Sequence, residues 1–144
     1  LLRLAPCPVL LVKNIRDWKR RRVLAAVNSQ TTDEAHIKLN HQIISFAQQF
    51  ADAYGTEAHV VTAYSDRNKI PIADELASDF GICADYVHVG EGKAAEVIRA
   101  TAERIEADLI LIGTVGRSGI KGTVVGNTSE RLLDHTQSDL LVLN

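Results

Sequence analysis

The stretch that decides the fold is Asp108–Thr128, DLILIGTVGRSGIKGTVVGNT. It begins with an uninterrupted apolar run, Leu109–Ile112, which is typical of a strand buried on both faces of a sheet. A glycine-rich segment, Gly113–Gly126, follows this strand and leads into a helical pattern. A buried strand, a glycine loop and a helix in this order predict an α/β unit whose loop lies at the carboxyl end of a parallel strand.

Strands and helices alternate before and after this stretch. Apolar runs predict strands at 23–27, 59–64, 86–89, 109–112 and 140–143, with a glycine turn at 90–92. Apolar residues at helical spacing predict a long helix between the capping box at 31–34 and Gly55, a short helix from Pro71 to about Gly81, and helices at 94–105 and 129–136. This alternation favours a doubly wound, open parallel sheet with helices on both faces.

An additional strand is predicted before the first strand of this unit. Residues 7–14, CPVLLVKN, repeat the pattern of residues 138–144, SDLLVLN. A protein with two tandem repeats, cut between them, explains both the additional strand and the repeated pattern. We therefore expect residues 1–14 to be the terminal strand of a preceding repeat, 15–22 to be a linker, and 23–144 to be a complete domain.

The composition excludes several classes of protein. The chain has 144 residues and a formal net charge of −2, which suits one domain and gives no broad basic field for nucleic acid. The one dense cationic run, Lys19–Arg22, is interpreted as a solvated linker. Cys7 and Cys83 match no metal-binding or disulfide spacing, and every apolar run is too short to span a bilayer. We predict a cytoplasmic protein that binds neither nucleic acid nor membranes.

The glycine loop is the candidate site because of its position. Ligands of open α/β sheets bind at the carboxyl ends of strands, and glycines there let backbone N–H groups approach phosphate oxygens. The helix that follows adds its unpaired N–H groups and the positive end of its dipole. Arg117 and Lys121 lie in the loop and would either neutralise phosphate charge or simply be solvated.

The glycines Gly113, Gly116 and Gly126 form the pattern Gly-x2-Gly-x9-Gly, which resembles the nucleotide loop of the universal stress protein family. The resemblance covers Val23 to Leu143, and the extra strand and the sequence at 126–130 are most similar to the tandem-domain branch of that family. It implies an adenine nucleotide alpha hydrolase-like fold, with a five-stranded sheet of order 3-2-1-4-5. It also implies that ATP or AMP, with or without Mg²⁺, lies across the ends of the first and fourth strands.

The resemblance also implies particular site residues. Phosphates and ribose would be faced by Gly113, Gly116, Gly126, Asn127 and Thr128, and the adenine side would be lined by Asn28, Ala63 and Ile112. Two positions depart from the family pattern, because nucleotide-binding members usually have an acidic residue in place of Asn28 and Ser or Thr in place of Asn127. An amide lacks the charged acceptor of a carboxylate, so these changes predict weaker binding. The alternative is a loop that has kept its structure without a ligand.

Three functions stay open from the sequence. The first is a nucleotide-responsive stress or regulatory module. The second is a structural or interaction module that acts by pairing with a sister domain or a second copy, with Val9–Lys13 antiparallel to Leu140–Leu143 at the sheet edge. The third is a slow ATP hydrolase, for which the sequence names no catalytic base. The five histidines are scattered over different elements and predict no metal cluster.

Overall fold

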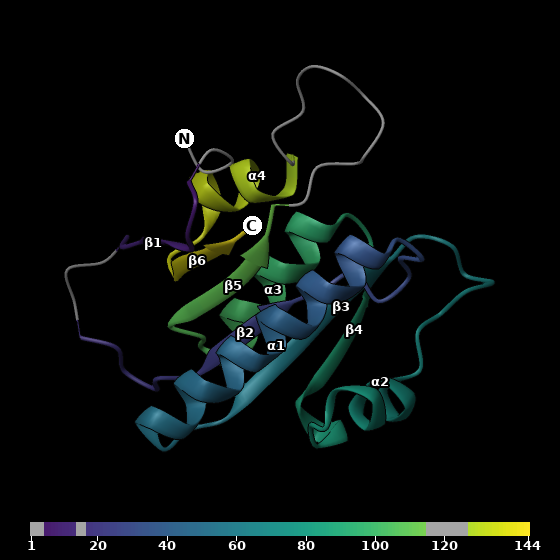
Figure 1. Ribbon diagram of the computed structural model, residues 1–144, viewed down its shortest axis with the longest axis horizontal. Coiled ribbons are helices and arrows are strands. Elements are labelled where there is room, and N and C mark those ends of the chain that lie inside the picture. The colour runs from purple at the N-terminus through teal and green to yellow at the C-terminus, as the bar shows by residue number, and fades with distance from the viewer. Residues whose placement is uncertain (1–4, 14–16, 115–126) are drawn as a thin grey trace.

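The computed structural model describes residues 5–13, 17–114 and 127–144. Its centre is a six-stranded sheet of order β1-β6-β5-β2-β3-β4 (Figure 1). The strands are β1 (Val9–Leu11), β2 (Val23–Ala26), β3 (Ala58–Tyr64), β4 (Val87–Glu91), β5 (Leu109–Gly113) and β6 (Asp139–Leu143). The helices are α1 (Glu34–Tyr54), α2 (Ala73–Phe80), α3 (Ala94–Ile105) and α4 (Asn127–His135), with a 3-10 turn, η1, at Ala84–Tyr86.

The strands β2 to β6 are parallel to their neighbours and follow the order β4-β3-β2-β5-β6. Counted from β2, this is 3-2-1-4-5, so the predicted doubly wound topology is confirmed. The additional strand β1 pairs antiparallel with β6, with Val9 opposite Val142 and Leu11 opposite Leu140. Within the described residues, no helix is long and apolar enough to cross a membrane.

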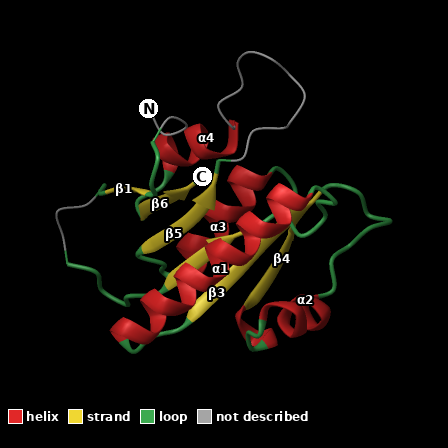
Figure 2. Ribbon diagram, in the orientation of Figure 1, coloured by secondary structure: helices red, strands yellow, loops and turns green. Residues whose placement is uncertain are grey.

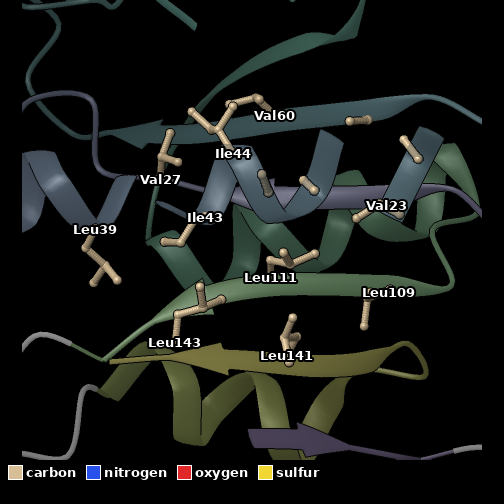
Figure 3. Packing of buried hydrophobic residues seen from close by; sticks show 14 residues of the cluster. Val23, Val27, Leu39, Ile43, Ile44, Val60, Leu109, Leu111, Leu141 and Leu143 are labelled. Atoms are coloured by element: carbon tan, nitrogen blue, oxygen red, sulfur yellow. The ribbon is translucent and has the colours of Figure 1, made fainter. Parts of the chain in front are cut away.

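Helices cover both faces of the sheet (Figure 2). On one face, Leu39, Ile43 and Ile44 of α1 pack against valines and leucines of β2, β3, β5 and β6 (Figure 3). On the other face, residues of α3 and Leu132 of α4 pack against Leu24, Ile110 and their neighbours. Because both sides of each central strand are buried, polar residues cannot alternate with apolar ones there, which explains the unbroken apolar runs in the sequence.

The long helix α1 has the predicted ends with one difference in its cap. The N-cap is Asp33 and not Thr31, because the Asp33 carboxylate accepts a hydrogen bond from the His36 backbone N–H at 3.2 Å. Thr31 instead accepts a bond from the Asp33 N–H at 3.3 Å, which shapes the approach to the helix. Gly55 ends the helix with a φ of 63°, the left-handed conformation that favours glycine.

Several element ends differ by one or two residues from the sequence prediction, among them the end of β1 at Leu11 instead of Lys13, and two further differences lie in β4 and α2. The strand β4 continues through Gly90 to Glu91 instead of turning at residue 90, because Gly90 pairs with Ala63 of β3. A Cβ at Gly90 would lie 2.4 Å from a methyl group of Val97, so this glycine allows α3 to approach the sheet. The short helix α2 begins at Ala73 and not at Pro71, while its end at Gly81 is as predicted.

The segment before β2 is held against the domain by two carboxylates. Asp108 accepts hydrogen bonds from the backbone N–H groups of Lys19, Arg20 and Arg21 at 3.3, 2.9 and 2.6 Å. The buried Asp139 accepts bonds from the Lys13 N–H at 2.7 Å and from the Trp18 indole N–H at 2.8 Å. The run 19–22 is therefore solvated, as its charges predicted, and is also held to the domain by backbone hydrogen bonds, which its charges did not predict.

Candidate functional site

A cavity of about 580 Å³ opens at the carboxyl ends of β2, β3 and β5. The chain places β3 and β4 on one side of β2, and β5 and β6 on the other, so the cavity lies where the strand order reverses. This is the usual ligand position in open α/β sheets, and the volume suits a small organic ligand. Thr128, in the first turn of α4, also lines it.

The backbone at the end of β2 is fixed by a side chain of α1. The Asn40 Oδ1 accepts the Asn28 backbone N–H at 3.2 Å, and the Asn40 Nδ2 donates to the Asn28 carbonyl at 2.8 Å. Asn40 is buried, so these two bonds satisfy both ends of its amide where water is scarce. Asn28 is therefore positioned at the cavity wall without any ligand.

The amide of Asn28 has a defined orientation. Its Oδ1 accepts the backbone N–H of Gln30 at 3.2 Å, which directs the oxygen toward the chain and leaves Nδ2 as the end that can donate to a ligand. Ser29 bonds Thr62 of β3 through its hydroxyl at 2.9 Å, and the Gln30 side chain donates to the Lys69 carbonyl. These contacts join the end of β2 to β3 and to the loop that follows it.

The described wall of the cavity carries no Asp, Glu, Lys or Arg side chain. Its polar groups are amides, hydroxyls and the imidazole of His36, whose Nδ1 lies 2.6 Å from the Asp33 carboxylate. Hydrogen bonding to His36 lowers the pKa of Asp33 below its ordinary value. In the described part of the chain, no group of three or more His, Cys, Asp or Glu side chains is arranged to bind a metal ion. The arrangement can bind a ligand by hydrogen bonds and apolar contacts.

Comparison with known proteins identifies the family to which this chain belongs. The model of the universal stress protein family matches residues 65–144, more than half of the chain. The chain belongs to the universal stress protein family. Universal stress protein E of Escherichia coli (strain K12) is 34% identical over 168 residues, which cover 99% of this chain and 52% of that protein. This chain thus spans about half the length of the curated relatives that it matches.

Solved structures agree with this assignment. A crystal structure of a Pseudomonas aeruginosa UCBPP-PA14 protein has a TM-score of 0.83 and 35% identity, covering 99% of this chain and 54% of that one. A crystal structure of a universal stress protein in complex with cAMP has a TM-score of 0.62 and 20% identity, covering 85% of this chain and 95% of that one. At this lower identity the likeness shows a shared universal stress protein fold.

The structure brings five of the predicted site residues of this universal stress protein domain together. The cavity is lined by Asn28, Ala63, Ile112, Gly113 and Thr128. Gly116, Arg117 and Gly126 lie outside the described residues. Asn127 begins α4, and its side chain is outside the described part. These residues come from β3, β5, α4 and the segment that directly follows β2, as expected for a site at the strand ends.

Gly113 has a packing role that the glycine motif did not reveal. A Cβ at this position would lie 2.3 Å from Leu39 Cδ2 and 2.8 Å from Leu39 Cγ, both in α1. Ordinary contacts between carbon atoms are about 3.5–4.0 Å, so even one methyl group cannot fit without displacing Leu39. In this universal stress protein, Gly113 therefore allows α1 to approach the end of β5, whatever it does toward a ligand.

Sequence reasoning missed several cavity residues, namely His36, Asn40, Tyr64 and Thr114. Asn40 had a detectable signal, because it is a polar residue on the buried stripe of α1 with Ile44 and Ala47. Thr114 directly follows Gly113, so the end of β5 brings both residues to the cavity wall. His36 and Tyr64 have no distinguishing pattern, since only the tertiary fold brings their elements to the same edge.

The sheet of this universal stress protein also brings together two histidines that the sequence left apart. His59 of β3 and His88 of β4 stack with ring centroids 5.2 Å apart, and His59 Nδ1 lies 2.9 Å from His88 Nε2. Arg104 of α3 contacts His88 Nδ1 at 3.1 Å. Burial and the Arg104 charge lower the pKa of His88 to about 4, and burial lowers that of His59 as well. Both imidazoles are therefore neutral near pH 7.

Proposed function

We propose that this universal stress protein domain binds an adenine nucleotide, ATP or AMP, in the cavity at the ends of β2, β3 and β5. Binding would regulate a surface of the protein in the cytoplasm instead of driving turnover. The observation that carries the proposal is that the cavity joins the start of the Gly113–Gly126 motif to the first turn of α4. Glycine N–H groups and a helix N-terminus at one cavity are the usual protein ligands of phosphate.

The remaining wall supports a nucleoside in the same cavity. Ala26, Ala63, Ile98 and Ile112 give it apolar surface for a base, while Asn28 supplies a hydrogen-bond donor. A structural neighbour was solved in complex with cAMP, which shows that this fold can bind an adenine nucleotide in another member. Mg²⁺ would accompany ATP and offset part of its phosphate charge.

Isothermal titration with Mg-ATP, ADP and AMP tests this proposal. We expect saturable heat with at least one of the three, and its loss in Gly116→Val, since a branched side chain would block the approach of the backbone to phosphate. The matched control is Gly122→Val, a glycine of the same loop outside the Gly-x2-Gly-x9-Gly motif. Absence of heat with all three nucleotides in the wild-type chain would refute nucleotide binding.

We also propose an interaction function, in which the domain pairs with a sister domain through β1 and β6. When residues 8–14 are aligned with 138–144, the identical triplets Leu10–Val12 and Leu140–Val142 coincide. The observed register joins Val9 to Val142, Leu10 to Leu141 and Leu11 to Leu140. Two copies of one edge strand that meet across a twofold axis pair antiparallel, as β1 and β6 do.

The sequence repeat and the antiparallel pairing support a tandem arrangement, with β1 as the last strand of a preceding domain. The half-length match to universal stress protein E is consistent with it. If β1 substitutes for a partner strand, disrupting it exposes the edge of β6 to a second copy. Sedimentation at equal concentrations should show more dimer for Leu10→Pro than for the wild type or for Val12→Pro, which lies beyond β1. Equal dimer fractions would argue against this arrangement.

A further inference from the structure

A hydrogen-bonded route leads from the cavity to the segment before β1. Thr114 lines the cavity, and its hydroxyl donates to the side-chain oxygen of Asn144 at the end of β6. The Asn144 Nδ2 in turn donates to the carbonyl of Ala5 at 2.7 Å. The cavity wall, the end of β6 and the N-terminal segment are thus joined by two side chains.

The direction of each bond in this route is determined by its chemistry. The Ala5 carbonyl can only accept, so it fixes the Asn144 amide with Nδ2 toward Ala5 and Oδ1 toward Thr114. The carbonyl of Leu143 already accepts the Thr114 backbone N–H at 2.9 Å and lies 3.3 Å from the hydroxyl. A hydroxyl has one hydrogen to donate, so Thr114 can serve only one strong acceptor at a time.

We infer that the Thr114 hydroxyl is a ligand-dependent switch, which donates to Asn144 in the empty site and to a phosphate oxygen of the bound nucleotide. The inference rests on the proposed nucleotide function of the cavity. A phosphate oxygen is charged and is therefore a stronger acceptor than a neutral amide oxygen. When the hydroxyl turns to phosphate, Asn144 loses its donor and the hold on Ala5 weakens.

The consequence is a coupling between the cavity and the β1–β6 pair. Ala5 lies four residues before β1, so a weaker bond there loosens the approach to the strand that covers β6. This is also the edge proposed above for pairing with a sister domain. Coupling is reciprocal for binding free energies, so a change that releases Asn144 must also tighten nucleotide binding.

The first experiment measures amide hydrogen exchange of residues 5–13 without nucleotide. Thr114→Val keeps the shape of the side chain and removes the hydroxyl, and Asn144→Ala breaks the same route at an exposed residue. Both variants should accelerate exchange in this segment by about two- to tenfold, the equilibrium equivalent of one ordinary hydrogen bond. Thr128→Val, another threonine of the cavity wall, is the matched control and should not. Unchanged exchange in both variants overturns the inference.

The second experiment adds saturating Mg-ATP, with binding measured separately by titration calorimetry. In the wild type, nucleotide should accelerate exchange of residues 5–13 to the level of unliganded Thr114→Val, and should add little in that variant. Asn144→Ala should bind Mg-ATP about two- to tenfold more tightly than the wild type. Heat without a change in exchange overturns the switch and leaves nucleotide binding intact. Absence of heat overturns the nucleotide function and this inference together.

Discussion

Replacing Gly113 by alanine tests whether this glycine is required by packing or by a ligand. The added Cβ would lie 2.3 and 2.8 Å from two atoms of Leu39 and 3.2 Å from Ile43 Cδ1. Leu39 is 6% exposed and Ile43 is 2% exposed, and both line the cavity, so making room for the methyl group shifts them toward the cavity and out of their packed positions. Overpacking of this kind costs about 1–3 kcal/mol, and the lower entropy of an unfolded alanine returns about 0.4–1 kcal/mol. We expect a net loss of about 1–2 kcal/mol without nucleotide.

A double-mutant cycle attributes this loss to the contact with α1. Leu39→Ala alone should cost about 2–5 kcal/mol through the cavity that it leaves. In the double variant Gly113→Ala/Leu39→Ala the new methyl group has room. The double variant should therefore lose about 1–2 kcal/mol less stability than the sum of the two single variants. The free energy of unfolding is measured by urea denaturation followed by circular dichroism, with no nucleotide present.

Two results would refute this reasoning. A Gly113→Ala variant as stable as the wild type would show that α1 does not restrict the position. Costs that add within about 0.5 kcal/mol in the double variant would show that the loss does not arise from Leu39. If stability is unchanged but Mg-ATP binding is lost, Gly113 serves the ligand and not the packing of the helix.

Three further predictions concern other parts of the domain. The free energy of unfolding should fall as the pH drops from about 6.5 to 4, because the His59–His88 pair stays neutral in the folded protein while the unfolded chain takes up the protons. Both histidines are partly exposed, so we expect a loss of about 1–2 kcal/mol. Urea titrations across this range check it, and a pH slope in His88→Gln as steep as in the wild type would contradict it. Asp108→Ala should accelerate tryptic cleavage at residues 19–22 by about tenfold, because it removes the acceptor of three backbone N–H groups, whereas the exposed Asp85→Ala should not. Asn28→Asp should tighten Mg-ATP binding by about three- to tenfold in calorimetry, because the carboxylate oxygen that replaces Nδ2 would be a charged acceptor for a ribose hydroxyl, whereas Nδ2 can only donate. The loop variant Asn68→Asp is the charge control, and equal affinities would count against a contact at Asn28.

The sequence predicted the fold well because both signals that define it are local. Unbroken apolar runs mark strands buried on two faces, and Gly55 and Gly81 mark helix ends through their left-handed conformation. The extension of β4 through Gly90 was missed, since the glycine serves a contact with Val97 that is distant in sequence. The His59–His88 pair was missed for the same reason, because the register of β3 against β4 cannot be derived from either strand alone.

The candidate site was predictable in position and less so in chemistry. The strand ends fixed where Asn28, Ala63 and Ile112 meet, but the role of Asn40 depends on how far α1 extends over the end of β2. Since the described wall has no Asp, Glu, Lys or Arg side chain, phosphate would be bound by backbone N–H groups and the Thr114 hydroxyl, by the N-terminus of α4, or by Arg117 and Lys121 of the glycine loop. The nucleoside and the phosphates would thus be bound by different parts of the chain. Asn40 and the strands hold the nucleoside side in place before any ligand arrives, so selectivity for the base would depend on the fixed wall, whereas the gain in affinity from adenosine to ATP would come from the loop, the N-terminus of α4 and Thr114.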